Sequence, residues 1–157
     1  MTTYTDKAAA MAAGGNVRTV LQYSDVMKQL VDEAKRPGFT VDSWAPLAAM
    51  VDVENFVRVG CFKEVVDWKQ YAAILTQWAT SSEWECSFKR ITEDAGRVFL
   101  ELEERSKVGD DRDVVNSLTV YEFNDAGKLR RLDIYLQREM HQTSTSGWDK
   151  DWAEAAA

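Results

Sequence analysis

The chain has 157 residues, of which 45% are hydrophobic and 11% aromatic; this length supports one substantial core and excludes two ordinary domains. Its net charge of −7 and the lack of a basic cluster argue against a nucleic-acid partner. No apolar run approaches the ~20 residues of a membrane-spanning helix, and the first residues lack the order of a secretory signal, so we expect a cytoplasmic protein with no membrane partner.

The chain offers few ligands for a metal. It has two cysteines, Cys61 and Cys86, and one histidine, His141, which cannot form a Cys/His zinc site without several carboxylates. It also lacks a phosphate-binding glycine motif and a nucleophile elbow. We therefore expect no metal and no cofactor. Both cysteines are interpreted as small apolar strand residues, and His141 as a surface residue rather than a proton shuttle.

The first third of the chain predicts helices. Residues 1–15 are rich in Thr and Ala and end in two glycines, which is typical of a flexible N-terminal arm or a loosely docked short helix. Apolar residues then recur at helical spacing from Asn16, the predicted N-cap, until Pro37 stops the pattern. Asp42 is the predicted cap of a short second helix that reaches Met50.

A short strand pair and a third helix are predicted next. Residues 55–59 form the first strand, and residues 61–66 are either its continuation or its partner. Asp67 then caps a helix with a single apolar stripe, which we interpret as core rather than as a cofactor contact. The stripe consists of Trp68, Tyr71, Ala72, Leu75 and Trp78.

Two β-hairpins follow. Residues 83–91 alternate between polar and apolar, and a turn at residues 94–96 leads to a partner strand at residues 97–107. Residues 114–123 and 129–136 form the second hairpin, because strand-forming residues flank an Asn-Asp-Ala-Gly turn. Alternation places Val115, Ser117, Thr119, Tyr121 and Phe123 on one face of the first strand, and Leu132, Ile134 and Leu136 on one face of the second.

The last turn also carries a family resemblance. The stretch Tyr121-Glu-Phe-Asn-Asp-Ala-Gly-Lys128 resembles the last two strands of the nuclear transport factor 2-like (NTF2-like) superfamily. That superfamily includes steroid isomerases, SnoaL-like polyketide cyclases, dehydratases, limonene-epoxide-hydrolase-like enzymes and non-catalytic binding domains. The resemblance therefore implies a fold more firmly than it implies a reaction.

The implied fold is α+β, with a cone-shaped, strongly curved antiparallel or mixed β-sheet and about three helices on its concave side. The single domain covers residues 16–140. Residues 141–157 form a C-terminal tail outside it, in which Trp148 and Trp152 are spaced for a small helix that covers the pocket mouth or a partner subunit. Disorder of the chain end is the alternative.

A cone of this kind is expected to enclose an apolar pocket suited to an aromatic or polycyclic ligand. Its expected lining, and thus the expected substrate-binding set, is Trp84, Phe88, Thr119, Tyr121, Leu132 and Ile134.

The resemblance implies Tyr23 as a hydrogen-bond donor, because steroid isomerases use a first-helix tyrosine in a similar Gln-Tyr context to bind an oxyanion. The alternative is a tyrosine at the edge of the core. Aligned through the shared turn, two positions that carry family acids hold Thr119 and Ile134, and the first-strand base falls on Arg58 or Val57, depending on the register. These departures disfavour a steroid isomerase or a limonene-type epoxide hydrolase. Arg58 is expected to orient the substrate or to stabilise charge.

A second set of candidate catalytic groups lies on one predicted strand, where Glu101, Glu103 and Arg105 share a face opposite Leu100 and Leu102. If the acids face the pocket, they form an acid/base centre with one carboxyl protonated by like-charge repulsion. If the leucines face inward, the acids are the solvated side of an amphipathic strand.

The function expected from these residues is a cofactor-independent acid/base enzyme, an isomerase, dehydratase or other lyase, that acts on a hydrophobic aromatic or polycyclic small molecule. The alternative is a non-catalytic small-molecule-binding or dimerisation domain of the same fold. A homodimer is expected in either case, because an open sheet leaves a broad apolar face, with Tyr135 as the candidate contact.

Overall fold

The computed structural model describes residues 1–139. The helical elements of this part are α1 (Lys7–Ala13), α2 (Gly15–Glu33), the 3-10 turn η1 (Val41–Trp44), α3 (Ala45–Ala48) and α4 (Trp68–Ala79). The strands are β1 (Thr2–Tyr4), β2 (Val57–Val59), β3 (Val65–Val66), β4 (Ser82–Asp94), β5 (Arg97–Val108), β6 (Asp111–Phe123) and β7 (Leu129–Arg138). The predicted tail, with His141, Trp148 and Trp152, lies outside the described residues.

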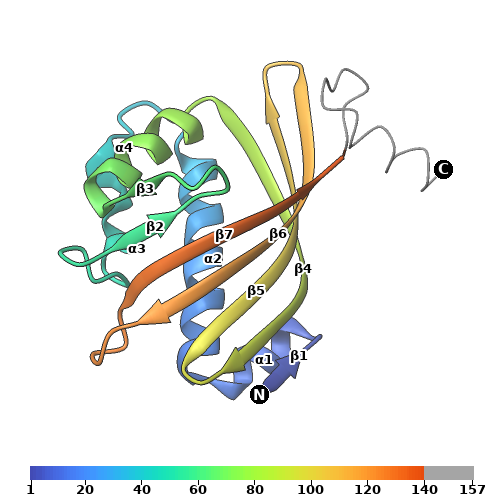
Figure 1. Ribbon diagram of the computed structural model, residues 1–157. Helices are drawn as coiled ribbons and strands as arrows, with labels where there is room; N and C mark the ends of the chain where they lie inside the picture. Colours follow the sequence, from blue (N-terminus) through green and yellow to red (C-terminus); the bar gives the residue numbers. More distant parts are fainter. Residues whose placement is uncertain (140–157) are drawn as a thin grey trace.

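The strands form one open mixed sheet in the order β1-β4-β5-β6-β7-β2-β3. The long strands β4 to β7 are antiparallel, whereas β2 runs parallel to β7 and brings Arg58 opposite Leu132. Figure 1 shows these long strands bending around α2, with α4 beside β2 and β3. The expected α+β fold with a strongly curved mixed sheet is confirmed.

The last hairpin closes as its sequence predicts. Asn124 accepts hydrogen bonds from the backbone N–H groups of Ala126 and Lys128 at 3.0 and 2.9 Å, and Gly127 has a φ of 76°, a conformation that favours glycine. The Asn124 amide also donates to the carboxylate of Asp52 at 3.0 Å. The turn is therefore tied to the segment that follows α3.

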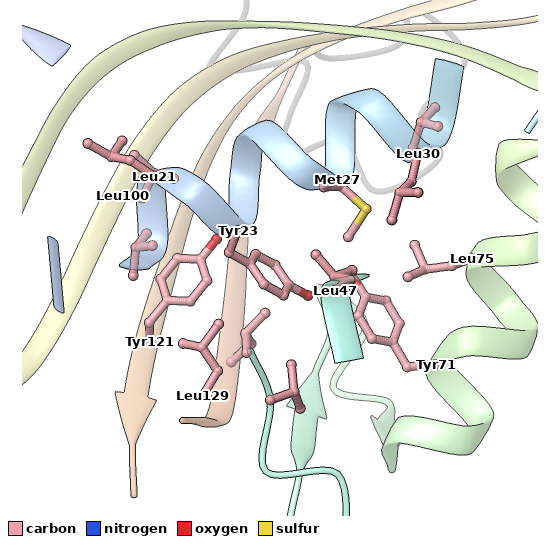
Figure 2. Packing of buried hydrophobic residues seen from close by; sticks show 14 of the residues in the cluster. Leu21, Tyr23, Met27, Leu30, Leu47, Tyr71, Leu75, Leu100, Tyr121 and Leu129 are labelled. Atoms are coloured by element: carbon pink, nitrogen blue, oxygen red, sulfur yellow. The ribbon is translucent and has the colours of Figure 1, made fainter. Parts of the chain in front are cut away.

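The helices cover the concave face of the sheet. α2 buries its apolar stripe against β4 and β5, and its residues interleave with those of α4 and the sheet in the core (Figure 2). At the start of α4, Asp67 accepts from the N–H of Gln70 at 2.8 Å, and the Gln70 side chain accepts from the N–H of Asp67 at 2.9 Å. This capping box confirms the predicted helix start.

Three predicted details of the N-terminal half are wrong. Of the two alternatives for residues 1–15, the flexible arm is wrong and the docked short helix is present as α1, whose Ala10 is fully buried, while β1 extends the sheet beside β4. Helix α2 starts at Gly15, because Gly14 at φ 74° ends α1 and also caps α2. Thr40, rather than Asp42, caps the second helical segment, since its side chain and that of Ser43 form the capping box.

Within residues 1–139, the helices are all too short or too polar to cross a lipid bilayer.

Candidate functional site

A cavity of about 390 Å³ lies between the concave face of the sheet and helices α2 and α4, within the size range of ligand pockets. Its lining combines apolar and aromatic side chains with a few polar groups. Its polar and aromatic lining includes Tyr23, Arg58, Tyr71, Trp84, Glu104 and Tyr121.

Five of the six expected lining residues border the cavity, namely Trp84, Thr119, Tyr121, Leu132 and Ile134. The cross-strand pairs explain why, since Thr119 lies opposite Ile134 and Tyr121 opposite Leu132 on one face of the hairpin. Phe88 is the exception, because the structure does not place it at the cavity as expected. It lies at a β-bulge of β4, where the register shifts, and its ring packs against the core instead of bordering the cavity.

Three tyrosines from three elements meet at the cavity. Tyr23 projects from α2 toward Tyr71 of α4, and Tyr121 of β6 lies on its other side (Figure 2). The rings of Tyr23 and Tyr121 are 6.1 Å apart in an edge-to-face arrangement. Tyr23 faces inward because it shares a helix face with Val20 and Met27, both of which are buried.

Within residues 1–139, the Tyr23 hydroxyl has no hydrogen-bond partner, although its side chain is only 3% exposed. Burial raises the pKa of Tyr23 well above its usual value, and the neighbouring phenols of Tyr71 and Tyr121 add to this effect. Burial also raises the pKa of Tyr71 and of Tyr121. All three phenols therefore stay protonated at neutral pH and act as hydrogen-bond donors.

Arg58 faces the cavity and Val57 the opposite side of the sheet, which answers the register question left by the sequence. The Arg58 guanidinium lies 4.8 Å above the ring of Tyr71. Its ion pair with Glu64 is long, at 3.5 Å, and its buried Nε has no acceptor in the described part of the chain. A Cβ on Gly60 would lie 1.6 Å from the Glu64 carboxylate, so a glycine there lets this carboxylate approach Arg58.

Glu104 is the carboxylate that faces the interior. It continues the inward phase of Leu100 and Leu102 along β5, and the indole N–H of Trp84 donates to its Oε1 at 2.9 Å. Its charge reaches across the cavity, because it contributes to the raised pKa of both Tyr71 and Tyr121. Glu104 is not among the residues expected from the sequence, although its spacing of two and four residues from Leu102 and Leu100 indicates that it shares their inward face.

Glu101 and Glu103 do not form the expected acid/base pair in the cavity. Leu100 and Leu102 are buried, at 1% and 9% exposure, so alternation turns both acids to the outer face of the sheet. There Glu101 pairs with Arg90 of β4, and Glu103 pairs with Arg105 at 2.9 Å. These carboxylates have no access to the cavity.

Tyr71 was assigned to a core stripe on α4, and the structure gives that stripe two roles. Tyr71, Ala72 and Leu75 are buried in the core. Tyr71, Leu75 and Trp78 also border the cavity. The period of a helix identifies the inward face but does not show whether a protein side chain or an empty space lies opposite.

Potential metal ligands are dispersed through the described part of the chain, where no three His, Cys, Asp or Glu side chains gather. Cys61 and Cys86 are both free thiols, and Cys61 borders the cavity.

The sequence matches no family model, and no curated protein matches it. A structural match with an NTF2-like protein of unknown function from Cytophaga hutchinsonii covers 78% of this chain and 89% of that protein, with a TM-score of 0.56 and 10% identity. This chain has the NTF2-like fold.

Two further solved structures share the NTF2-like fold. A candidate isomerase from Rhodopseudomonas palustris matches over 76% of this chain and 90% of its own, with a TM-score of 0.60 and 12% identity. A candidate SnoaL-like polyketide cyclase from Jannaschia sp. CCS1 matches over 78% and 85%, with a TM-score of 0.54 and 16% identity. At such identities the likeness concerns the fold, and function has to be argued from the cavity of this NTF2-like chain.

Proposed function

We propose that this protein is a cofactor-independent enzyme that transfers protons on a hydrophobic small molecule, as an isomerase, dehydratase or other lyase does. The observation that carries the proposal is the buried, unpartnered hydroxyl of Tyr23 at the cavity. An unsatisfied buried hydroxyl costs about 1–3 kcal/mol of stability, and such groups concentrate at functional sites. A substrate oxygen would supply the missing acceptor.

The proposed chemistry assigns separate roles to two side chains that border the cavity, Tyr23 and Glu104. The Tyr23 phenol donates to a carbonyl oxygen of the substrate and stabilises the negative charge that develops there. Glu104 accepts the proton from the adjacent carbon, held in place by the Trp84 indole. In an isomerase the proton returns to another carbon, and in a lyase a leaving group departs from the β-carbon. Related chemistry is named for the isomerase and cyclase candidates that share the fold.

Deuterium exchange tests the proton transfer without knowledge of the natural substrate. The protein is incubated in D2O with bicyclic and tricyclic ketones such as 1-tetralone, and deuterium uptake at the α-carbon is followed by mass spectrometry. Glu104→Gln keeps an acceptor for Trp84 but not a base, so exchange should fall about 10²–10⁴-fold. Tyr23→Phe should lose about 10²–10³-fold.

Glu103→Gln is the matched control, because it makes the same change on the outer face of the same strand. Exchange at the wild-type rate is expected for it. The proposal is wrong if no ketone of the panel exchanges faster than in buffer, or if Glu104→Gln exchanges as fast as Glu103→Gln.

One observation favours a second candidate function, a non-catalytic ligand-binding domain. Thr119 and Ile134 border the cavity at positions where related enzymes carry acids, and neither is a proton acceptor of that kind. In that case Glu104→Gln would leave ligand affinity unchanged, and wild-type protein would bind the ketones without exchange.

A further inference from the structure

The charged side chains that border the cavity differ in the hydrogen-bond and ion-pair partners that they have. At the rim, Arg138 and Asp113 pair with each other. Glu104 has the Trp84 indole as its donor. Arg58 differs from these groups, because its buried Nε has no hydrogen-bond partner within residues 1–139, and its ion pair with Glu64, at 3.5 Å, is longer than a normal hydrogen bond.

Apart from the distant Glu64 carboxylate, the groups next to the Arg58 guanidinium carry no negative charge. The Tyr71 ring lies under it at 4.8 Å, and the Tyr71 and Tyr23 phenols border the same cavity. Both phenols are protonated at neutral pH, because burial raises their pKa. A guanidinium offers five N–H donors in a planar fork that matches a carboxylate with two parallel hydrogen bonds, and it does so most effectively where water is excluded.

From this incompletely paired guanidinium and the phenol donors beside it, we infer that the natural ligand is a hydrophobic carboxylic acid, whose carboxylate binds Arg58 with help from the Tyr71 hydroxyl. The inference rests on the proposed function insofar as that function makes the cavity a substrate site. The hydrophobic body would lie along Met27, Leu132 and Ile134, toward Glu104. A singly charged carboxylate fits better than a phosphate dianion, because Glu104 borders the same cavity and the chain carries a net charge of −7.

Isosteric pairs of ligands test the inference. Benzoate, 2-naphthoate and 2-anthracenecarboxylate are titrated into the wild-type protein by calorimetry, each beside its neutral amide. We expect at least one acid to bind ten times or more as tightly as its amide. Arg58→Gln should bring that ratio to about one, and Arg58→Lys should restore part of it, since lysine keeps the charge but not the fork.

Two further variants separate this role from a general effect of charge. Glu64→Gln removes the carboxylate that competes for Arg58, so the acid should bind several times more tightly than it binds to wild-type protein. Arg131→Gln removes a positive charge from the outer face, where Arg131 pairs with Asp133, and should leave the ratio unchanged. Circular dichroism and thermal melts show whether each variant is folded.

The inference is overturned if no acid of the three binds more tightly than its amide, or if folded Arg58→Gln keeps the wild-type ratio. Its failure is distinct from that of the proposed function. Acid selectivity without deuterium exchange would support the inference and refute the enzyme, whereas exchange without acid selectivity would do the reverse.

Discussion

Replacement of Tyr23 by phenylalanine should make the protein more stable and less active. The Tyr23 hydroxyl is buried without a partner, so the native state carries a desolvation cost of about 1–3 kcal/mol that phenylalanine does not have. The vacated hydroxyl leaves a small void that offsets part of the gain. We therefore expect Tyr23→Phe to raise the free energy of unfolding by about 1–2 kcal/mol, or the Tm by about 2–8 °C for a domain of this size.

Urea and thermal unfolding, followed by circular dichroism, measure this change. Tyr135→Phe is the matched control, because its side chain is 59% exposed on the outer face of the sheet and its stability should change by less than about 0.5 kcal/mol. A Tyr23→Phe variant that is clearly less stable than wild type would refute the reasoning, because it would mean that the hydroxyl has a partner. A Tyr23→Phe variant with higher stability and slower deuterium exchange would show the trade-off between stability and activity that is common at active sites.

Three other predictions concern separate parts of the molecule. We propose that the outer face of the sheet holds a second copy of the chain, so Tyr135→Glu should convert a dimer into a 17.8 kDa monomer in sedimentation experiments; wild-type protein that is monomeric at micromolar concentration would contradict this. Iodoacetamide at pH 8 should alkylate exposed Cys61 faster than Cys86, because burial, with a contribution from the charge of Glu104, raises the pKa of the Cys86 thiol. Peptide mass spectrometry after short pulses of iodoacetamide gives both alkylation rates, and equal rates would count against the difference in burial. Hydrogen bonds from Asn124 and Asn55 lower the pKa of Asp52. The contribution of Asp52 to stability is therefore present above the unfolded-state pKa of about 4 and is lost as the pH falls through the lower folded-state pKa. Asp52→Asn should flatten the acid side of a plot of stability against pH, and an unchanged slope would show that Asp52 does not contribute.

The hairpin strands and their inward faces were predictable because the local signals agree with the tertiary structure. The alternation in β6 and β7 assigns Thr119, Tyr121, Leu132 and Ile134 to one face, and a closed turn at Asn124 holds their register. The same alternation contained Glu104. Glu104 is in phase with the buried Leu100 and Leu102, whereas Glu101 and Glu103 are the more conspicuous acids of the strand but lie out of phase with them.

Other parts of the site could not be predicted from local pattern. Strand β2 has three residues, too few to show a period, and its orientation is decided by parallel pairing with β7 far along the chain. The inward position of Arg58 is thus a tertiary property. Residues 2–4 likewise become a strand only because the edge of β4 is there to pair with them, a circumstance that threonine-rich composition does not reveal.

The parallel pairing of β2 with β7 also bears on synthesis of the protein on the ribosome. Arg58 is translated early, but the strand that fixes its position opposite Leu132 is the last strand of the described domain. The nascent chain can form its helices and the β4–β5 hairpin while β2 still lacks its neighbour, and long-range pairings of this kind form slowly. During that interval Arg58 and the tyrosines of the future cavity are exposed to solvent. A small molecule that binds these residues can do so only after β7 has left the ribosome and paired with β2. It would therefore stabilise the folded protein without assisting the early steps of folding.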